Sequence, residues 1–379
     1  PAYADIDPIT VQKILATDGI NDDKFGHSVS VDGNIALIGA AGDDNGKGSA
    51  YVFVRSLDGT WTQQQKLNAN DGAAHDAFGC SVSVSGNTAV IGAYGDDNDA
   101  GLYPIFNTGS AYVFVQSGKI WSQQAKLIFS DEPFGGDAFG WSVSVDRDTA
   151  LIGAIWSNFD YSGSAYVFVR SGTGWSQQAK FTGDGPGDGF GWSVSLNGDT
   201  ALVGAALRDD SDAGTAHIFV RSGTVWNKQA MLVATDIDDP VFPFDEDGYG
   251  RSVSVSGDTA VIGATGDYVG SAYIFLRSGT VWSQQAMLTA SDRTEGDKFG
   301  TSVSVDGNTV VVGARGDGNT GLAYIFLRSG KVWSQQIKLT EEDGFGGAVF
   351  VDGDTVLIGA RGNENSKGAA YAYSGQWKK

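Results

Sequence analysis

The sequence contains a single cysteine, Cys80, so it cannot form a disulfide bond within the chain. Basic residues are also scarce, with 25 Lys and Arg against 45 acidic residues and a formal net charge of −20. A nucleic-acid-binding surface needs a basic patch, so this composition argues against DNA or RNA as a partner. No uninterrupted apolar run reaches about 18 residues, so we expect no insertion into a membrane.

One sequence unit recurs seven times, at intervals of about 50 residues. It opens on an aromatic residue followed by Gly, continues to a Gly-Ala pair and closes on a Trp that begins a W-x-Q-Q-x-K-L segment. Repeats of this length are typical of stacked or radially arranged units. The openings lie at Phe25, Phe78, Phe139, Phe190, Tyr249, Phe299 and Phe345.

Each unit predicts four short strands. A Ser-Val-Ser-Val alternation has the period of a strand, and the Asp-Gly, Ser-Gly or Asn-Gly that follows is typical of a tight hairpin turn. A β-branched run, an Ala-Tyr-Val-Phe-like run and the Trp segment supply the other three strands. Side-chain size increases along the unit, as expected for a wedge with a narrow inner edge. Four-stranded wedges around an axis form a β-propeller, so we expect an all-β, seven-bladed fold.

The two ends of the chain predict how this ring closes. Unit seven stops just after Trp377, without the strand that should follow. The missing pattern is found near the N-terminus, where Val11 to Leu15 approximates Q-x-K-L. We therefore expect one domain over residues 1–379, with a lead at 1–8 and a strand at 9–17 that completes blade seven. Such closure also removes exposed strand edges.

The aromatic-Gly opening followed by Gly-Ala after an apolar strand resembles the FG-GAP repeat, best known from integrin α-subunit propellers and related bacterial proteins. The resemblance extends from Phe25 to Trp377 and includes the N-terminal strand. Integrin-type calcium loops place a D-x-D-x-D-G run between strands one and two. This chain has only short turns there, such as Asp32-Gly33-Asn34, so the family's calcium ligands cannot be carried over.

The acidic residues are concentrated in two sets of loops. We call the end of the ring with the loops that lead into the first strands, and those that join the second to the third strands, the top rim; the opposite end is the bottom rim. These top-rim loops hold most of the acids, which predicts an acidic top face. Their Asp side chains either satisfy loop N–H groups or bind Ca²⁺. The candidate calcium ligands are Asp43, Asp44, Asn45, Asp96, Asp97, Asn98, Asp99, Asp209, Asp210 and Asp212.

Several top-rim loops over blades two to four break the repeat and carry extra aromatic residues. Loops on a rigid scaffold are where binding residues usually lie, and aromatic rings beside carboxylates suit a sugar or a protein contact. The alternative is that these rings fold inward and seal their own loops. The candidate ligand-binding residues are Tyr103, Phe106, Phe134, Trp156, Phe159 and Tyr161.

Catalytic signatures are weak. The three histidines fall at unrelated repeat positions, and the sequence has no nucleophile motif, metal-ligand spacing or phosphate-binding loop, so it predicts no enzyme. The residue after the opening Gly varies between units, so we interpret Cys80 as a structural thiol. The residues at this position are His27, Cys80, Trp141, Trp192, Arg251, Thr301 and Gly347.

One tripeptide, Arg315-Gly316-Asp317, spells a cell-adhesion motif. Blade seven has Arg361-Gly362-Asn363 at the same place in the repeat. We therefore interpret the tripeptide as a variant of the repeat's own turn rather than as an adhesion signal.

Together these features predict an extracellular or cell-surface recognition or adhesion module that binds a protein or a glycan through its top face, with Ca²⁺ as a candidate cofactor. A lectin-like carbohydrate-binding protein is the first alternative, and a polysaccharide-active enzyme is the second. The sequence opens on Pro1 rather than Met, which leaves open the removal of a secretion signal.

Overall fold

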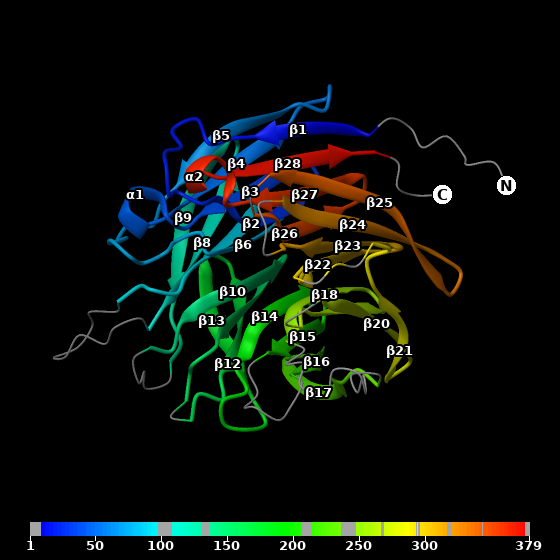
Figure 1. The fold of residues 1–379 in the computed structure, drawn as a ribbon. Helices are drawn as coiled ribbons and strands as arrows, with labels where there is room; N and C mark the ends of the chain where they lie inside the picture. The colour runs from blue at the N-terminus through cyan, green and yellow to red at the C-terminus, as the bar shows by residue number, and fades with distance from the viewer. Residues whose placement is uncertain are drawn as a thin grey trace.

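The computed structural model describes residues 9–97, 108–130, 136–158, 160–206, 214–235, 248–266, 269–292, 294, 296–316, 320–342 and 344–375. Seven antiparallel sheets of four strands each make up the fold. Each sheet contacts the next through its first strand, and the last contacts the first, so the sheets form a closed ring (Figure 1). The predicted seven-bladed β-propeller is therefore confirmed.

The first strand of each blade faces the axis of the ring. A bulge follows the opening aromatic in most blades, after which Ser and Val alternate in register with the second strand. The first strands are β2 (Phe25–Asp32), β6 (Ser81–Ser85), β10 (Phe139–Asp146), β14 (Phe190–Asn197), β18 (Tyr249–Ser256), β22 (Phe299–Asp306) and β26 (Phe345–Asp352).

The second strands are almost wholly buried, as their continuous apolar runs require. They are β3 (Ile35–Ala40), β7 (Thr88–Ala93), β11 (Thr149–Ala154), β15 (Thr200–Ala205), β19 (Thr259–Ala264), β23 (Thr309–Ala314) and β27 (Thr355–Ala360). Short helical turns follow β3 and β27 on the top rim, namely α1 (Asp43–Gly46) and α2 (Asn363–Ser366).

The third strands bring large aromatic residues against the opening phenylalanine. In blade one the Phe25 ring lies 5.4 Å from the Tyr51 ring and 6.0 Å from the Phe53 ring, both edge-on. Edge-on pairs are a favoured arrangement for buried rings. The third strands are β4 (Ser49–Arg55), β8 (Ser110–Ser117), β12 (Ser164–Ser171), β16 (Thr215–Ser222), β20 (Ser271–Ser278), β24 (Thr320–Ser329) and β28 (Ala369–Ser374).

The outer strands join neighbouring blades through the Gln residues of the W-x-Q-Q-x-K-L segment. Gln65 accepts a hydrogen bond from the backbone N–H of Trp121 and donates one to the carbonyl of the same residue, both at 2.8 Å. The outer strands are β5 (Trp61–Leu67), β9 (Ile120–Leu127), β13 (Gly174–Thr182), β17 (Val225–Leu232), β21 (Val281–Leu288), β25 (Val332–Glu342) and the N-terminal β1 (Thr10–Ile14).

The two glycines that define the repeat meet where blades pack. Ser28 Oγ donates to the carbonyl of Gly79 in the next blade at 2.9 Å. A Cβ on Gly39 would lie 2.0 Å from that same oxygen, so only Gly fits. Five more seams repeat the serine bond, whereas blade seven has Ala348 in place of the Ser.

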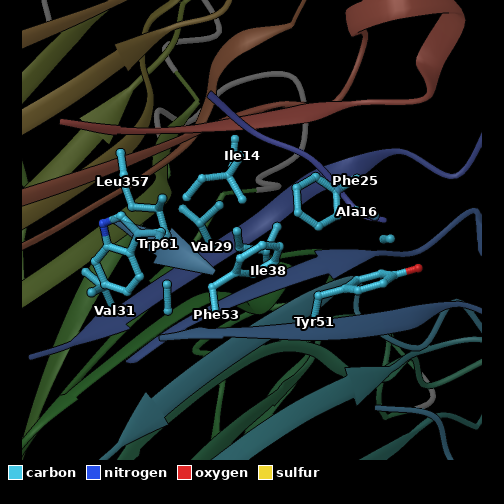
Figure 2. Packing of buried hydrophobic residues seen from close by; sticks show 14 residues of the cluster. Ile14, Ala16, Phe25, Val29, Val31, Ile38, Tyr51, Phe53, Trp61 and Leu357 are labelled. Carbon is cyan, nitrogen blue, oxygen red and sulfur yellow. The ribbon is translucent and has the colours of Figure 1, made fainter. Parts of the chain in front are cut away.

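Strand β1 completes blade seven, as the sequence predicts. It pairs antiparallel with β28, and the blue β1 lies beside the red β28 in Figure 1. Gln12 on β1 makes the same two 2.8 Å bonds to Trp61 that Gln65 makes to Trp121. Ile14 joins Phe25, Val29 and Leu357 in the buried cluster between blades seven and one (Figure 2).

Candidate binding site at the mouth of the channel

The first strands enclose a cavity of about 610 Å³ on the axis of the ring. All seven blades contribute to its wall, and the wall is built mainly from the repeating Ser-Val pairs, such as Ser28 and Val29. These serines already bond to neighbouring blades, so the lower wall has a structural role. A cavity of several hundred Å³ is within the usual size range of ligand pockets.

The side chains at the top mouth of this channel do not follow the seven-fold repeat. They come from two repeat positions, the residue after the opening aromatic-Gly and the residue after Gly-Ala. We define the channel mouth by these lining residues: His27, Cys80, Tyr94, Trp141, Trp192, Arg251, Thr301, Arg315, Gly347 and Arg361.

Blades two to four give the channel mouth an aromatic arc. The Trp141 ring is central, with Tyr94 at 5.1 Å and Trp192 at 5.3 Å between ring centroids. Trp156, just above on the same rim, lies 6.2 Å from Trp141. Tyr94, Trp141 and Trp192 are half-buried, so parts of these rings remain open to the channel.

Blades five to seven give the channel mouth an arginine arc, formed by Arg251, Arg315 and Arg361. The two arcs meet where the guanidinium of Arg251 lies over the Trp192 ring, 5.3 Å from its centroid, in a cation–π contact. Within the described part of the chain, none of these three arginines pairs with a carboxylate. Gly347 lies beside Arg315, whose Cδ is 3.7 Å from where a Cβ on Gly347 would be.

The clustered positive charges perturb one another. Loss of hydration, followed by the charges of Arg315 and Arg251, lowers the pKa of Arg361 to about 10. The Arg251 side chain is exposed to the channel. Its pKa is lowered, first because the surrounding protein reduces its hydration and second because of the positive charge of Arg315. Repulsion of this kind is relieved when an anion binds, so the channel mouth is electrostatically prepared for one.

Cys80 also borders the channel mouth. It is a free thiol, and burial raises its pKa to about 11. A thiol with so high a pKa is almost entirely protonated at neutral pH and therefore weakly nucleophilic. This agrees with the interpretation of Cys80 as a structural thiol.

The structure describes two of the six aromatic residues predicted to bind ligand. Trp156 is 42% exposed and lies beside the aromatic arc. Tyr161 is 64% exposed and has a positive φ of 57°. Tyr103, Phe106, Phe134 and Phe159 lie outside the described residues.

Two of the predicted calcium clusters fall partly within the described residues. Asp43 is buried, accepts a hydrogen bond from Ser49 and lies 2.6 Å from the ammonium of Lys66. That ammonium also contacts Asp18 at 2.7 Å, and thus provides positive charge between two carboxylates. Asp44 and Asn45 are exposed in left-handed conformations.

Blade two repeats this arrangement. Asp96 is buried, lies 2.6 Å from the ammonium of Lys126 and accepts a hydrogen bond from the Tyr112 hydroxyl at 3.0 Å. Asp97 is exposed. Across the described residues, no three His, Cys, Asp or Glu side chains group as metal ligands. The remaining candidates, Asn98, Asp99, Asp209, Asp210 and Asp212, lie outside the described residues, so calcium binding stays a prediction.

The channel mouth was not predicted as a site from the sequence. The available signal was the variation at one repeat position, where Trp, Arg and His replace one another while the next two residues are nearly always Ser and Val. The acidic composition instead favoured the carboxylates of the top-rim loops as the candidate site. Arg251, Arg315 and Arg361 are far apart in the sequence, and they lie together only because the ring closes.

All seven repeat units match one known sequence family. The FG-GAP repeat pattern matches residues 9–53, 61–114, 121–168, 175–219, 226–275, 282–326 and 333–373. The chain belongs to the FG-GAP repeat family. Each matched segment runs from an outer strand into the three inner strands of the next blade, and the first begins at the closing strand β1.

The FG-GAP propeller is consistent with a protein-binding or adhesion-type module. No curated relative matches the chain. Among the described residues, no helix has the length and apolar character needed to cross a membrane.

Proposed function

We propose that this FG-GAP propeller is an extracellular or cell-surface recognition module that binds a protein or a glycan at its top rim, with the channel mouth at the centre of the contact. One observation carries the proposal. The inward-facing positions that hold the ring together repeat Ser and Val in nearly every blade, whereas the two positions at the channel mouth vary widely in size, charge and aromatic character around the ring.

Residues that only maintain a repeat fold are expected to repeat with it, because every blade presents the same geometry. Side chains that differ between blades at one level of a rigid ring make an asymmetric surface from a symmetric scaffold. Aromatic and Arg residues, which form the two arcs of the channel mouth, are also among those most enriched at binding hot spots. These considerations support recognition rather than catalysis at the channel mouth.

The lectin-like alternative gains support from the half-buried indoles of Trp141 and Trp192. Aromatic rings with one accessible side are suitable platforms for the apolar face of a sugar ring, because the negative face of the ring attracts polarised C–H groups. A protein-binding module and a lectin bind different classes of partner, so one experiment that offers both classes can distinguish them.

The experiment measures binding of the purified protein to immobilised glycans and to immobilised extracellular-matrix proteins. A Thr301→Trp variant serves as the blocked form, because two other blades carry Trp at this repeat position and Trp should fill the channel mouth without distorting the blade. We expect the unaltered protein to bind members of one set of probes, and the variant to lose that binding while its melting temperature is unchanged. Equal binding by both proteins, or binding to neither set, would contradict the proposal.

A further inference from the structure

We infer that the channel mouth binds the terminal residue of an acidic sugar chain, a pyranose ring that carries a carboxylate. This inference rests on the proposed recognition function and names the ligand class. Its basis is the division of one cavity into an arginine arc and an aromatic arc that meet at Arg251 and Trp192.

The arginine arc differs from the other arginines of the molecule. On the bottom rim the guanidinium groups of Arg170, Arg221 and Arg277 contact hairpin carboxylates at 2.5–2.7 Å. At the channel mouth, Arg315 and Arg251 are exposed to the channel and, within the described residues, have no carboxylate partner. Arg presents paired N–H donors that match the two oxygens of a carboxylate. Arginines that have no carboxylate partner within the described residues are therefore suited to bind an anion of this shape.

The aromatic arc restricts what carries the anion. The ligand must present an apolar face close to its charge, because the Arg251 guanidinium lies only 5.3 Å from the centre of the Trp192 ring. A uronic acid meets this requirement, since its carboxylate is attached directly to a ring whose C–H groups can pack on an indole. An acidic amino-acid side chain supplies the carboxylate but no ring.

The surrounding charge favours end-on entry of a single acidic residue. The net charge of the chain is −20, and exposed carboxylates such as Asp44 and Asp97 lie on loops of the same top rim. A polyanion lying across this rim would be repelled along its length. A chain that inserts one acidic end residue avoids most of that repulsion and reaches the arginines. The cavity of about 610 Å³ has room for a terminal residue and part of the next.

The test is calorimetric titration with two disaccharides that differ in one group, one ending in glucuronic acid and the other in glucose. We expect the acidic disaccharide to bind at least about tenfold more tightly than the neutral one. Arg315→Gln should remove at least about tenfold of that affinity, and Arg315→Lys, which keeps charge but not the paired donors, should be intermediate. Arg147→Gln is the matched control, because Arg147 is 86% exposed on the bottom rim and should leave binding unchanged.

Equal affinity for the two disaccharides, or unaltered affinity in Arg315→Gln, would overturn the inference. Acetate and a glutamate-containing peptide supply two further arms. If either binds as tightly as the acidic disaccharide, the ring contact is wrong and the ligand is a simple carboxylate or a protein side chain. In that case the recognition function still stands, provided that Thr301→Trp abolishes binding to the immobilised probes. The ligand class and the proposed function can therefore fail separately.

Discussion

Arg361 in blade seven donates a hydrogen bond from Nη1 to Nδ1 of His27 in blade one, across 3.2 Å and 334 residues of sequence. Because Arg has no acceptor, His27 must accept at Nδ1 and carry its proton on Nε2. Burial, followed by the charges of Arg361 and Lys24, lowers the pKa of His27 to about 3. The histidine is therefore neutral at physiological pH, and the channel mouth owes its charge to arginine.

This pair predicts a pH dependence of stability. The unfolded chain protonates His27 below about pH 6.5, whereas the folded chain does not do so until about pH 3. In this window the unfolded state binds the extra proton, so the free energy of unfolding falls with decreasing pH by up to about 1.4 kcal/mol per unit. His27→Gln keeps an acceptor for Arg361 without a titrating group. We expect the variant to gain about 2 kcal/mol relative to the unaltered protein between pH 7 and pH 5.

Chemical denaturation of both proteins at several pH values measures this difference. The other two histidines and the carboxylates titrate equally in both proteins, so they cancel in the comparison. Parallel stability curves for the two proteins would show that His27 is not held neutral in the folded state.

A second prediction concerns the seam closed by β1. In five other seams the indole N–H of the Trp donates to a Gln of the preceding blade, as Trp121 does to Gln64 at 3.2 Å. Val11 stands at the equivalent position of β1, and among the described residues the buried Trp61 Nε1 has no hydrogen-bond partner. Since Val11 is 54% exposed, Val11→Gln should supply the missing acceptor at little cost. We expect a gain of about 1 kcal/mol in the free energy of unfolding.

Thermal or denaturant unfolding measures the gain. Val11→Thr, which is similar in size to Val but cannot reach the indole, is the control and should show no gain. A Val11→Gln protein no more stable than this control would mean that Trp61 is already satisfied by water.

The third prediction removes the closing strand. Without residues 1–17, the edge of β28 and the indole of Trp61 are exposed, and Gln12 no longer joins blades seven and one. An open strand edge pairs readily with another chain, so the truncated protein should melt at lower temperature and aggregate. Light scattering during a thermal ramp detects both effects. A truncated protein that melts like the full chain would show that closure by β1 contributes little.

The fold could be predicted from the sequence because its structural demands repeat. The glycines of each unit meet a neighbouring carbonyl, as Gly39 meets Gly79, and no other residue fits there. The same contact is required in every blade, so the pattern appears seven times and can be recognised from the sequence alone. Closure could be predicted for the same reason, because β1 retains the Gln that binds Trp61.

The candidate site could not be predicted in this way, because its residues are the ones that depart from the repeat. Arg251, Arg315 and Arg361 occupy two different repeat positions on three blades, and Arg361 meets His27 only because the ring closes. The buried acids Asp43 and Asp96, which the composition emphasised, bind Lys66 and Lys126 of their own blades. The partner lysines belong to the repeated Q-x-K-L pattern, a pairing that could have been anticipated from the sequence.

The acidic top-rim loops predict that the stability of the protein depends on Ca²⁺. If the top-rim loops bind Ca²⁺, the folded state gains about 2.7 kcal/mol when the ion is present at 100 times its dissociation constant. The melting temperature should then rise in millimolar Ca²⁺ and fall with a chelator, and Mg²⁺ should help less because it requires tighter octahedral geometry. A melting temperature indifferent to the chelator would leave the acids with lysine pairing, turn formation and solvation as their roles.

The last prediction concerns Trp156, which is 42% exposed on the top rim and lies 6.2 Å from Trp141 in the aromatic arc. A ring in this position extends the arc outward and can cover a ligand that occupies the channel mouth. Because much of the ring is exposed in the free protein, Trp156→Ala should change the melting temperature little. Burial of such a ring against a ligand stabilises a complex by about 1.5–3 kcal/mol, so the substitution should weaken binding of the acidic disaccharide at least about tenfold. The same direction is expected for Tyr103→Ala.

Leu57→Ala is the matched control for this experiment, since Leu57 is a fully exposed apolar residue in a bottom-rim turn. It should alter neither the disaccharide affinity nor the melting temperature. If Trp156→Ala instead lowers the melting temperature and spares binding, the ring belongs to the packing of its own loop. Ligand contact would then be confined to the channel mouth, where Trp141 and Trp192 supply the rings and Arg315 the charge.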